Sequence, residues 1–182
     1  MNDMERAKKL LAEGNYTLAA CKGEEEYVSA ERGVRPLLEL IDAQRSLAGY
    51  SVADRVVGRA AAYLYVELAA RSVYARVMSR AAQEVFDRFG VEHGADEVVD
   101  AIANRTNTGL CPMESAVWDI PDPAEAELIA NTIAKLPDIA RAEVVRRHDG
   151  DSDRCADEEV DKEVVEVGRR TDRRTFAAKA RI

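Results

Sequence analysis

The chain has 182 residues, of which 47% are hydrophobic and 33% are charged, as expected of one soluble domain with a sizeable core. A formal net charge of -8 disfavours tight binding to nucleic acid or to an anionic membrane, because both require clustered cations. Cys21, Cys111 and Cys155 are too irregularly spaced for a disulfide framework, and the charged N-terminus has no signal peptide. We therefore expect a cytoplasmic protein with neither nucleic-acid nor membrane partners.

The first half of the chain predicts a helix, a hairpin and a second helix. Apolar spacing indicates a helix over 4–11 that Gly14 ends, and two short apolar runs indicate antiparallel strands over 16–30, followed by a helix over 37–42. The strongest helical pattern starts at Ser51, which with Asp54 has the spacing of a capping box. The segment becomes apolar on all sides from Ala60, so we expect it to be a buried central helix.

The second half predicts a buried strand over 72–78 and a helix over 80–89, which Ser79 caps and Gly90 ends. A short strand over 91–93 and a helical turn within 96–103 are expected next. Pro112 precedes a helix over 113–118, and a last helix runs from Asp122 to residue 136.

This order of elements predicts an α/β domain in which helices cover both faces of a sheet. The fold expected is a three-layer sandwich with a mixed sheet of four to five strands, formed by residues 1–137. The remaining residues, 138–182, are dense in charges of both signs and poor in large apolar side chains. We interpret them as a charged C-terminal extension, partly helical or disordered.

Four blocks of sequence resemble an uncharacterised prokaryotic family of domains of unknown function. They are Asn-Tyr-Thr-Leu at 15–18, Glu-Arg-Gly-Val-Arg-Pro-Leu-Leu at 31–38, the segment 51–62, and Thr-Gly-Leu-Cys-Pro-Met-Glu at 108–114. The resemblance covers residues 5–135. That family is similar in fold to cytidine deaminases, so the resemblance implies a cytidine-deaminase-like sandwich without an established activity.

Zinc deaminases place His or Cys before Ala-Glu at the start of the central helix, and Pro-Cys-x-x-Cys at the start of the next. The corresponding positions here are expected to be Val52-Ala53-Asp54 and Ser79-Arg80, and valine cannot ligate a metal. Imidazole could come only from His93 and His148. We therefore predict no catalytic zinc, no other metal and no cofactor.

The expected start of the central helix is the first candidate site. Its backbone N–H groups would favour an anion, and Arg55 and Arg59 would add charge beside Ser51 and Asp54. Gly58 lowers helix stability relative to alanine, so it requires a reason, either close approach of a ligand or close packing on a strand. The alternative is that Ser51 and Asp54 only cap the helix and the arginines are solvated.

Two further candidates lie in the segment 104–114. Cys111, before a helix that Pro112 starts, could have a lowered pKa and act as a nucleophile, although Glu114 would oppose thiolate formation. The alternative is a small buried cysteine. Asn104, Arg105 and Thr108 could hold a phosphate or a ribose, or could form a plain turn.

The function that these candidates favour is a zinc-free deaminase-like domain that binds a small anionic, nucleotide-like ligand. Arg55, Arg59 and Arg105 would hold the anion, and Ser51, Asn104 and Thr108 would orient it. An enzyme alternative makes Cys111 the nucleophile of a group transfer, with Asp54 as its proton acceptor. A third hypothesis is a non-catalytic interaction protein. Both ligand hypotheses require these residues to converge at one edge of the sheet; the residues leave the oligomeric state open, a homo-oligomer included.

Overall fold

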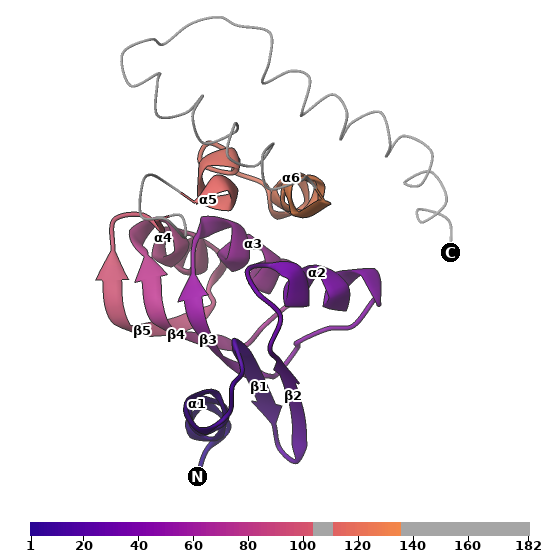
Figure 1. Cartoon of the computed structure of the whole chain (residues 1–182), viewed down its shortest axis with the longest axis vertical. Helices are drawn as coiled ribbons and strands as arrows, with labels where there is room; N and C mark the ends of the chain where they lie inside the picture. Colours follow the sequence, from indigo (N-terminus) through magenta and orange to yellow (C-terminus); the bar gives the residue numbers. More distant parts are fainter. Residues whose placement is uncertain (104–110, 136–182) are drawn as a thin grey trace, which may run out of the picture.

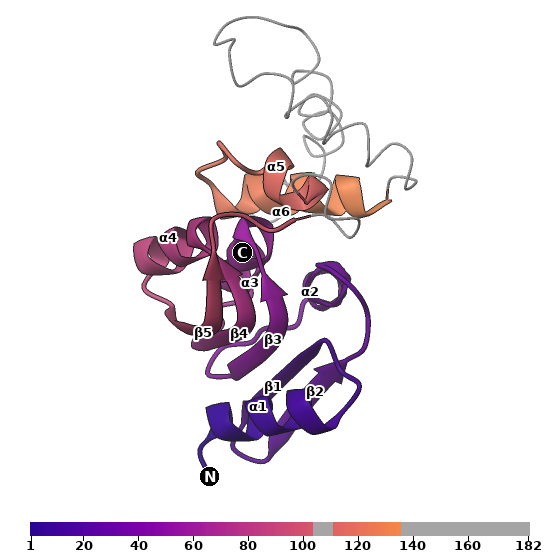
Figure 2. The same ribbon diagram turned by 60° about the vertical axis from the view of Figure 1, so that its left-hand side comes forward.

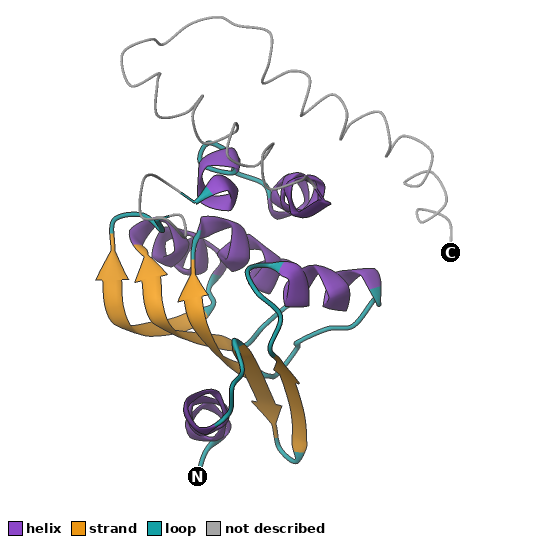
Figure 3. Cartoon of the chain, viewed as in Figure 1, coloured by secondary structure: helices purple, strands orange, loops and turns teal. Residues whose placement is uncertain are grey.

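A mixed sheet of five strands forms the centre of the structure, a computed structural model that describes residues 1–103 and 111–135 (Figures 1 and 3). The strand order is β2-β1-β3-β4-β5, in which β1 is antiparallel to β2 and β3, while β3, β4 and β5 are parallel. The strands are β1 (Leu18–Lys22), β2 (Glu25–Ser29), β3 (Ser51–Val57), β4 (Ser72–Ser79) and β5 (Glu92–Val99). The predicted α/β class, the mixed sheet and its antiparallel hairpin are confirmed.

Helices lie on both faces of this sheet (Figures 1 and 2). One face carries α1, and the other carries α2, α3 and α4; α5 and α6 lie beyond α3, so that α3 stands between them and the sheet. The helices are α1 (Asp3–Glu13), α2 (Arg35–Asp42), α3 (Arg59–Glu67), α4 (Arg80–Phe89), α5 (Pro112–Ala116) and α6 (Pro123–Lys135). No helix in the described ranges is both long and apolar enough to cross a membrane.

Two hydrophobic cores follow from this layering. On one face Ala7 and Leu11 of α1 pack against small strand residues, Ala19, Cys21 and Ala53. The larger core on the other face contains α3, whose residues 60–65 are all buried. A helix that is apolar on all sides must be covered on all sides, which explains why α3 lies between the sheet and α6.

Local signals fix several helix ends, and those at Gly14, Ser79 and Gly90 are the ones that the sequence predicts. Asn2 and Glu5 form a reciprocal capping box at the start of α1, and Gly14 ends it. The Ser79 hydroxyl accepts a hydrogen bond from Ala82 N at 3.1 Å, and Gly90 ends α4 with a φ of 69°. A left-handed residue at this position favours glycine because a Cβ would be strained there.

The predicted helix from Ser51 is wrong in its first seven residues. Residues Ser51–Val57 form β3, and the helix starts only at Arg59, after Gly58 in extended backbone. The β-branched residues Val52, Val56 and Val57 favour a strand. Because β3 is central and its first three residues are buried on both faces, it lacks the alternation of a half-exposed strand, and its apolar positions also fit a helical spacing.

The predicted helical turn within 96–103 is also wrong in its first residues, because β5 extends from Glu92 to Val99. The strand carries three acidic residues, which obscure the apolar signal of a strand. Charges are tolerated because β5 lies at the edge of the sheet, where Glu92, Asp96 and Glu97 are exposed. The later helices begin where Pro112 and Asp122 predict them.

Truncation after Leu136 is predicted to leave a domain that unfolds cooperatively, because both described cores close within residues 1–135. The proposed C-terminal extension, 138–182, lies outside the described residues. Thermal unfolding of the full and the truncated chain by circular dichroism measures this. Loss of the cooperative transition on truncation would show that the extension completes the domain.

Candidate functional site

The carboxyl ends of β3, β4 and β5 meet α5 and the starts of two long helices. In Figure 1 the arrowheads of these strands point to the side on which α5 and α6 lie, and Figure 2 shows the same arrangement. Val57 leads through Gly58 into α3, and Ser79 ends β4 and caps α4. Parallel strands bring both helix N-termini, which are positive ends of helix dipoles, to this edge.

The two helix starts are capped differently. Ser79 caps α4 with its own hydroxyl, whereas Gly58 has no side chain with which to cap α3. The acceptor at α3 comes from α5 instead: Oε2 of Glu114 accepts a hydrogen bond from Arg59 N at 2.6 Å. A carboxylate at the start of a helix satisfies an N–H group and interacts favourably with the dipole.

Close packing with Glu114 explains Gly58. A Cβ added at residue 58 would fall on Oε2 of Glu114 and would lie 3.0 Å from Cγ1 of Ile102. The backbone of Gly58 is extended (φ -98°), so glycine is required here by the neighbouring carboxylate and not by its own conformation. The group that approaches Gly58 is therefore a side chain of this chain, where the sequence suggested a ligand or a strand.

Glu114 is 1% exposed, and packing of α5 holds it there. Met113, Ala116 and Val117 on either side of Glu114 pack against the large core. Burial raises the pKa of the Glu114 carboxyl, while the nearby Ser79 hydroxyl, the N–H groups of Arg59 and Ile102 and the charge of Arg59 act in the opposite direction.

Three buried side-chain atoms in this part of the chain lack hydrogen-bond partners, and one of them belongs to the Glu114 carboxylate itself. Oε1 of Glu114 makes no hydrogen bond of normal geometry in the described residues, and neither does Oγ of Ser115, which is 2% exposed. Nε of Arg59 is likewise buried without a partner. Buried polar atoms in native proteins are nearly always hydrogen-bonded, so these three atoms are exceptions that the described residues do not explain.

Arg59 is the half-buried cation of this edge. Its Nη2 lies 3.5 Å from the Tyr63 hydroxyl, and that hydroxyl donates to Ile120 O at 2.5 Å. Arg80, at the start of α4, is more exposed and pairs with Asp100 at 2.8 Å.

Cys111 begins α5 and lies at the same edge. Its N–H donates to Ile102 O at 2.7 Å, and its carbonyl accepts from Ser115 N at 3.0 Å. These bonds join the segment after β5 to the helix that carries Glu114. The thiol is partly buried. Because α5 has only five residues, its dipole is small, so the predicted effect of a helix dipole on the Cys111 thiol is weak.

Asp54 is placed differently from its prediction. It lies within β3, where Oδ2 accepts a hydrogen bond from the Tyr65 hydroxyl at 2.5 Å and Oδ1 accepts from Val56 N at 3.1 Å. Burial raises its pKa to about 6, against the opposing hydrogen bonds of Tyr65, Val56 and Arg55. Asp54 therefore fastens α3 to the sheet and does not cap a helix.

The other predicted site residues are only partly brought together. Ser51 is fully buried at the opposite end of β3 from Gly58, where its hydroxyl accepts from that of Ser72 at 3.0 Å. Arg55 is half-buried in β3, with Nε lacking a partner among the described residues. Asn104, Arg105 and Thr108 lie outside the described residues. The structure thus gathers Arg59 and Cys111 at one edge. From the sequence, Glu114 is considered only for its effect on the Cys111 thiol and is not placed at the start of α3.

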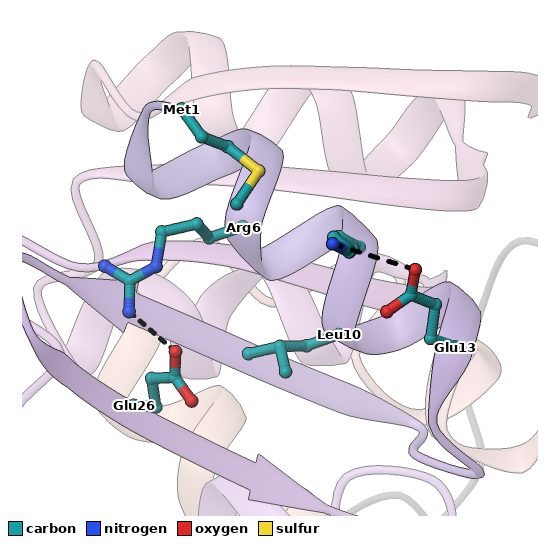
Figure 4. Close-up of a pocket in the computed structure, with 6 residues that line it drawn as sticks. Met1, Arg6, Leu10, Glu13 and Glu26 are labelled. Atoms are coloured by element: carbon teal, nitrogen blue, oxygen red, sulfur yellow. Dashed lines mark hydrogen bonds and ion pairs between the residues drawn. The ribbon is translucent and has the colours of Figure 1, made fainter.

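A shallow hollow elsewhere on the molecule has different chemistry (Figure 4). It lies between the outer side of α1 and β2 and is lined by Met1, Arg6, Lys9, Leu10, Glu13 and Glu26. Arg6 pairs with Glu26 at 2.6 Å and Lys9 with Glu13 at 3.9 Å. Its charges already pair with one another, so the hollow gives no reason to assign a ligand to it.

Gly58→Ala is expected to lower the free energy of unfolding by about 2 kcal/mol, because the new methyl group overlaps the Glu114 carboxylate. In a Glu114→Ala background the same substitution should have a much smaller effect, so the two changes are coupled. Denaturant unfolding of the wild-type protein, the two single variants and the double variant measures this coupling.

The two single variants define the additive expectation against which the stability of the double variant is compared. Additive effects of the Gly58 and Glu114 changes would contradict the packing explanation.

The raised pKa of Asp54 predicts a pH-dependent stability. Because the folded-state pKa of about 6 exceeds the ordinary 3.8, the folded chain binds this proton more tightly than the unfolded chain. The stabilisation is present below pH 3.8 and is lost as the pH rises through 6, by about 3 kcal/mol. Asp54→Asn should remove the decrease in stability between pH 3.8 and pH 6. If the free energy of unfolding of the wild-type protein and of Asp54→Asn changes with pH in the same way, the prediction is wrong.

Comparisons with known proteins place the chain in a family. The family model described as TM1506, a domain of unknown function (DUF1893), matches residues 6–133. A solved structure of a DUF1893 family protein (TM1506) from Thermotoga maritima is similar, with 27% sequence identity and a TM-score of 0.68, over 72% of this chain and 89% of that chain. No curated protein matches the chain. Because the matched region covers most of the chain, this protein belongs to the DUF1893 family of domains of unknown function.

Proposed function

We propose that this DUF1893 domain binds a small nucleotide-like ligand at the carboxyl edge of β3 and β4, in a zinc-free, cytidine-deaminase-like fold. The observation that carries the proposal is the carboxylate of Glu114, which is 1% exposed and has one oxygen that makes no hydrogen bond of normal geometry in the described residues, although the Ser79 hydroxyl and the Ile102 N–H group lie near the carboxylate. An acceptor left unsatisfied in a dry site is unfavourable, and a ligand that donates an N–H group would satisfy it.

Glu114 also determines how such a ligand would be oriented. Its other oxygen already accepts from Arg59 N, so the start of α3 is occupied by a negative charge of the chain itself. An anionic group of the ligand would therefore pair with the guanidinium of Arg59, and a donor group would face Glu114. Nucleotides carry both kinds of group, a phosphate and the N–H groups of a base.

Two features support the deaminase-like and zinc-free parts of the proposal. The parallel β3 and β4 each lead directly into a helix, so two helix starts flank one site. The residues at these starts are Gly58-Arg59 and Ser79-Arg80, where a deaminase requires zinc ligands and a catalytic Glu. These positions, and not Val52 to Asp54, are the relevant ones, since α3 starts at Arg59. A cytoplasmic location, inferred from charge and cysteine content, belongs to the same proposal.

Titration calorimetry with nucleoside monophosphates and the matching nucleosides tests the proposal. Glu114→Gln keeps a carbonyl oxygen for Arg59 N but replaces the other acceptor with an N–H donor, so it should weaken binding of both probes about tenfold. Arg59→Ala should weaken the monophosphate more than the nucleoside. Cys111→Ala should leave the affinity for both probes intact, because the proposed binding contacts come from Glu114 and Arg59.

Arg71→Ala is the matched control for Arg59→Ala. Arg71 is exposed and lies just before the first residue of β4, at the end of the strand away from the proposed site. Its loss should therefore leave the affinity for both probes unchanged. Absence of binding by every probe, or equal affinities of the wild-type protein and Glu114→Gln, would overturn the proposal.

A further inference from the structure

The outer edge of the sheet is a second surface that the fold leaves open. β5 lies at the end of the strand order and pairs with β4 on one side, and none of the described residues pairs with its other side. Eight residues, Glu92–Val99, therefore present a row of backbone N–H and C=O groups. Such a long edge is a template for another strand unless something covers it.

Gly94, in the middle of β5, is not explained by packing against any of the described residues. Its φ is not in the left-handed region, and a Cβ at this position would meet nothing within 4 Å. Glycine in the interior of a strand weakens the strand and often marks the close approach of another backbone. None of the described residues makes that approach, so the space beside Gly94 is open to a backbone from outside this part of the chain.

We infer that β5 pairs antiparallel with β5 of a second copy of this chain, around a two-fold axis that passes beside Ala95. A two-fold axis perpendicular to the sheet keeps each side chain on its own face, so paired residues must both be odd-numbered or both even-numbered. The axis must then pass beside a residue and not between two residues. Of all the registers in which the two strands could pair, only the half with the axis beside a residue satisfies this symmetry.

Charge selects among the remaining registers. An axis beside Gly94 would oppose Glu92 of one copy to Asp96 of the other, twice, and an axis beside Asp96 or Glu97 would oppose that acid to itself. Like charges directly opposite one another are destabilising. The acidic residues therefore exclude the registers with the axis beside Gly94, Asp96 or Glu97. An axis beside His93 brings no two acids together, but it would pair only residues 92–94 of the strand and leave the rest of β5 open.

An axis beside Ala95 opposes no two acids. It places His93, the only basic residue of β5, opposite Glu97 of the second copy, and Glu92 opposite Val98. Val98 is 42% exposed in the single chain, and this pairing would cover it. Because the interface is symmetric, each favourable pair forms twice.

Sedimentation analysis of the full chain over a micromolar range of concentration tests the inference. The wild-type chain, with a mass of 20.1 kDa, should reach twice that mass. Val98→Glu places a new acid of each copy opposite Glu92 of the other copy, and should therefore weaken association about tenfold. Val98→Lys removes the same exposed valine but adds a cation opposite Glu92, so it should associate at least as well as the wild-type protein.

Val56→Glu is the control, since Val56 is 47% exposed but belongs to the interior strand β3. Val56→Glu should leave the association constant unchanged. Added salt should reduce the difference in association constant between Val98→Glu and Val98→Lys, because salt screens their charges. A monomeric mass of the wild-type protein throughout, or equal association of Val98→Glu and Val98→Lys, would overturn the inference.

Discussion

The structure depends on one buried carboxylate placed between helices. Glu114 closes the start of α3 from a position 55 residues later in the chain, so α3 is completed only when α5 is in place. The contact requires a glycine at position 58, and it also requires the apolar residues beside Glu114 to seat α5 on the core. The same carboxylate gives this edge its polarity, because the positive end of α3 faces an acid of the chain itself.

Most of the fold could be predicted from local patterns in the sequence. The hairpin, α4 with its Ser79 cap and Gly90 end, and the later helices all carry short-range signals that need no knowledge of the tertiary structure. The two errors concern strands whose pattern depends on their surroundings. β3 lacks alternation because its first residues are buried on both faces, and β5 carries acids because none of the described strands pairs with its outer side.

The candidate site could be predicted only in part, because its principal contact is not local. Arg59 and Cys111 lie at the edge that the sequence indicates, but Ser51 and Asp54 were assigned to a helix start that does not exist at Ser51. Nothing in the sequence pairs Glu114 with Gly58. Gly58 did signal that some group approaches its backbone, yet identifying that group requires knowing which segment crosses the end of β3. The Asp54–Tyr65 pair was missed for the same reason, since a tyrosine in an apolar helix resembles any core residue.

The two tyrosines of α3 also determine how the layers can move. Tyr63 and Tyr65 are separated by about 200° around the helix, and their hydroxyls bond to groups on opposite sides: Ile120 beyond the helix and Asp54 in the sheet. Both rings are almost completely buried. Sliding of either layer along α3 would break a hydrogen bond where no water can replace it. The sheet, α3 and the segment around Ile120 are therefore mechanically one body, and shear between them is suppressed from both sides of the same helix.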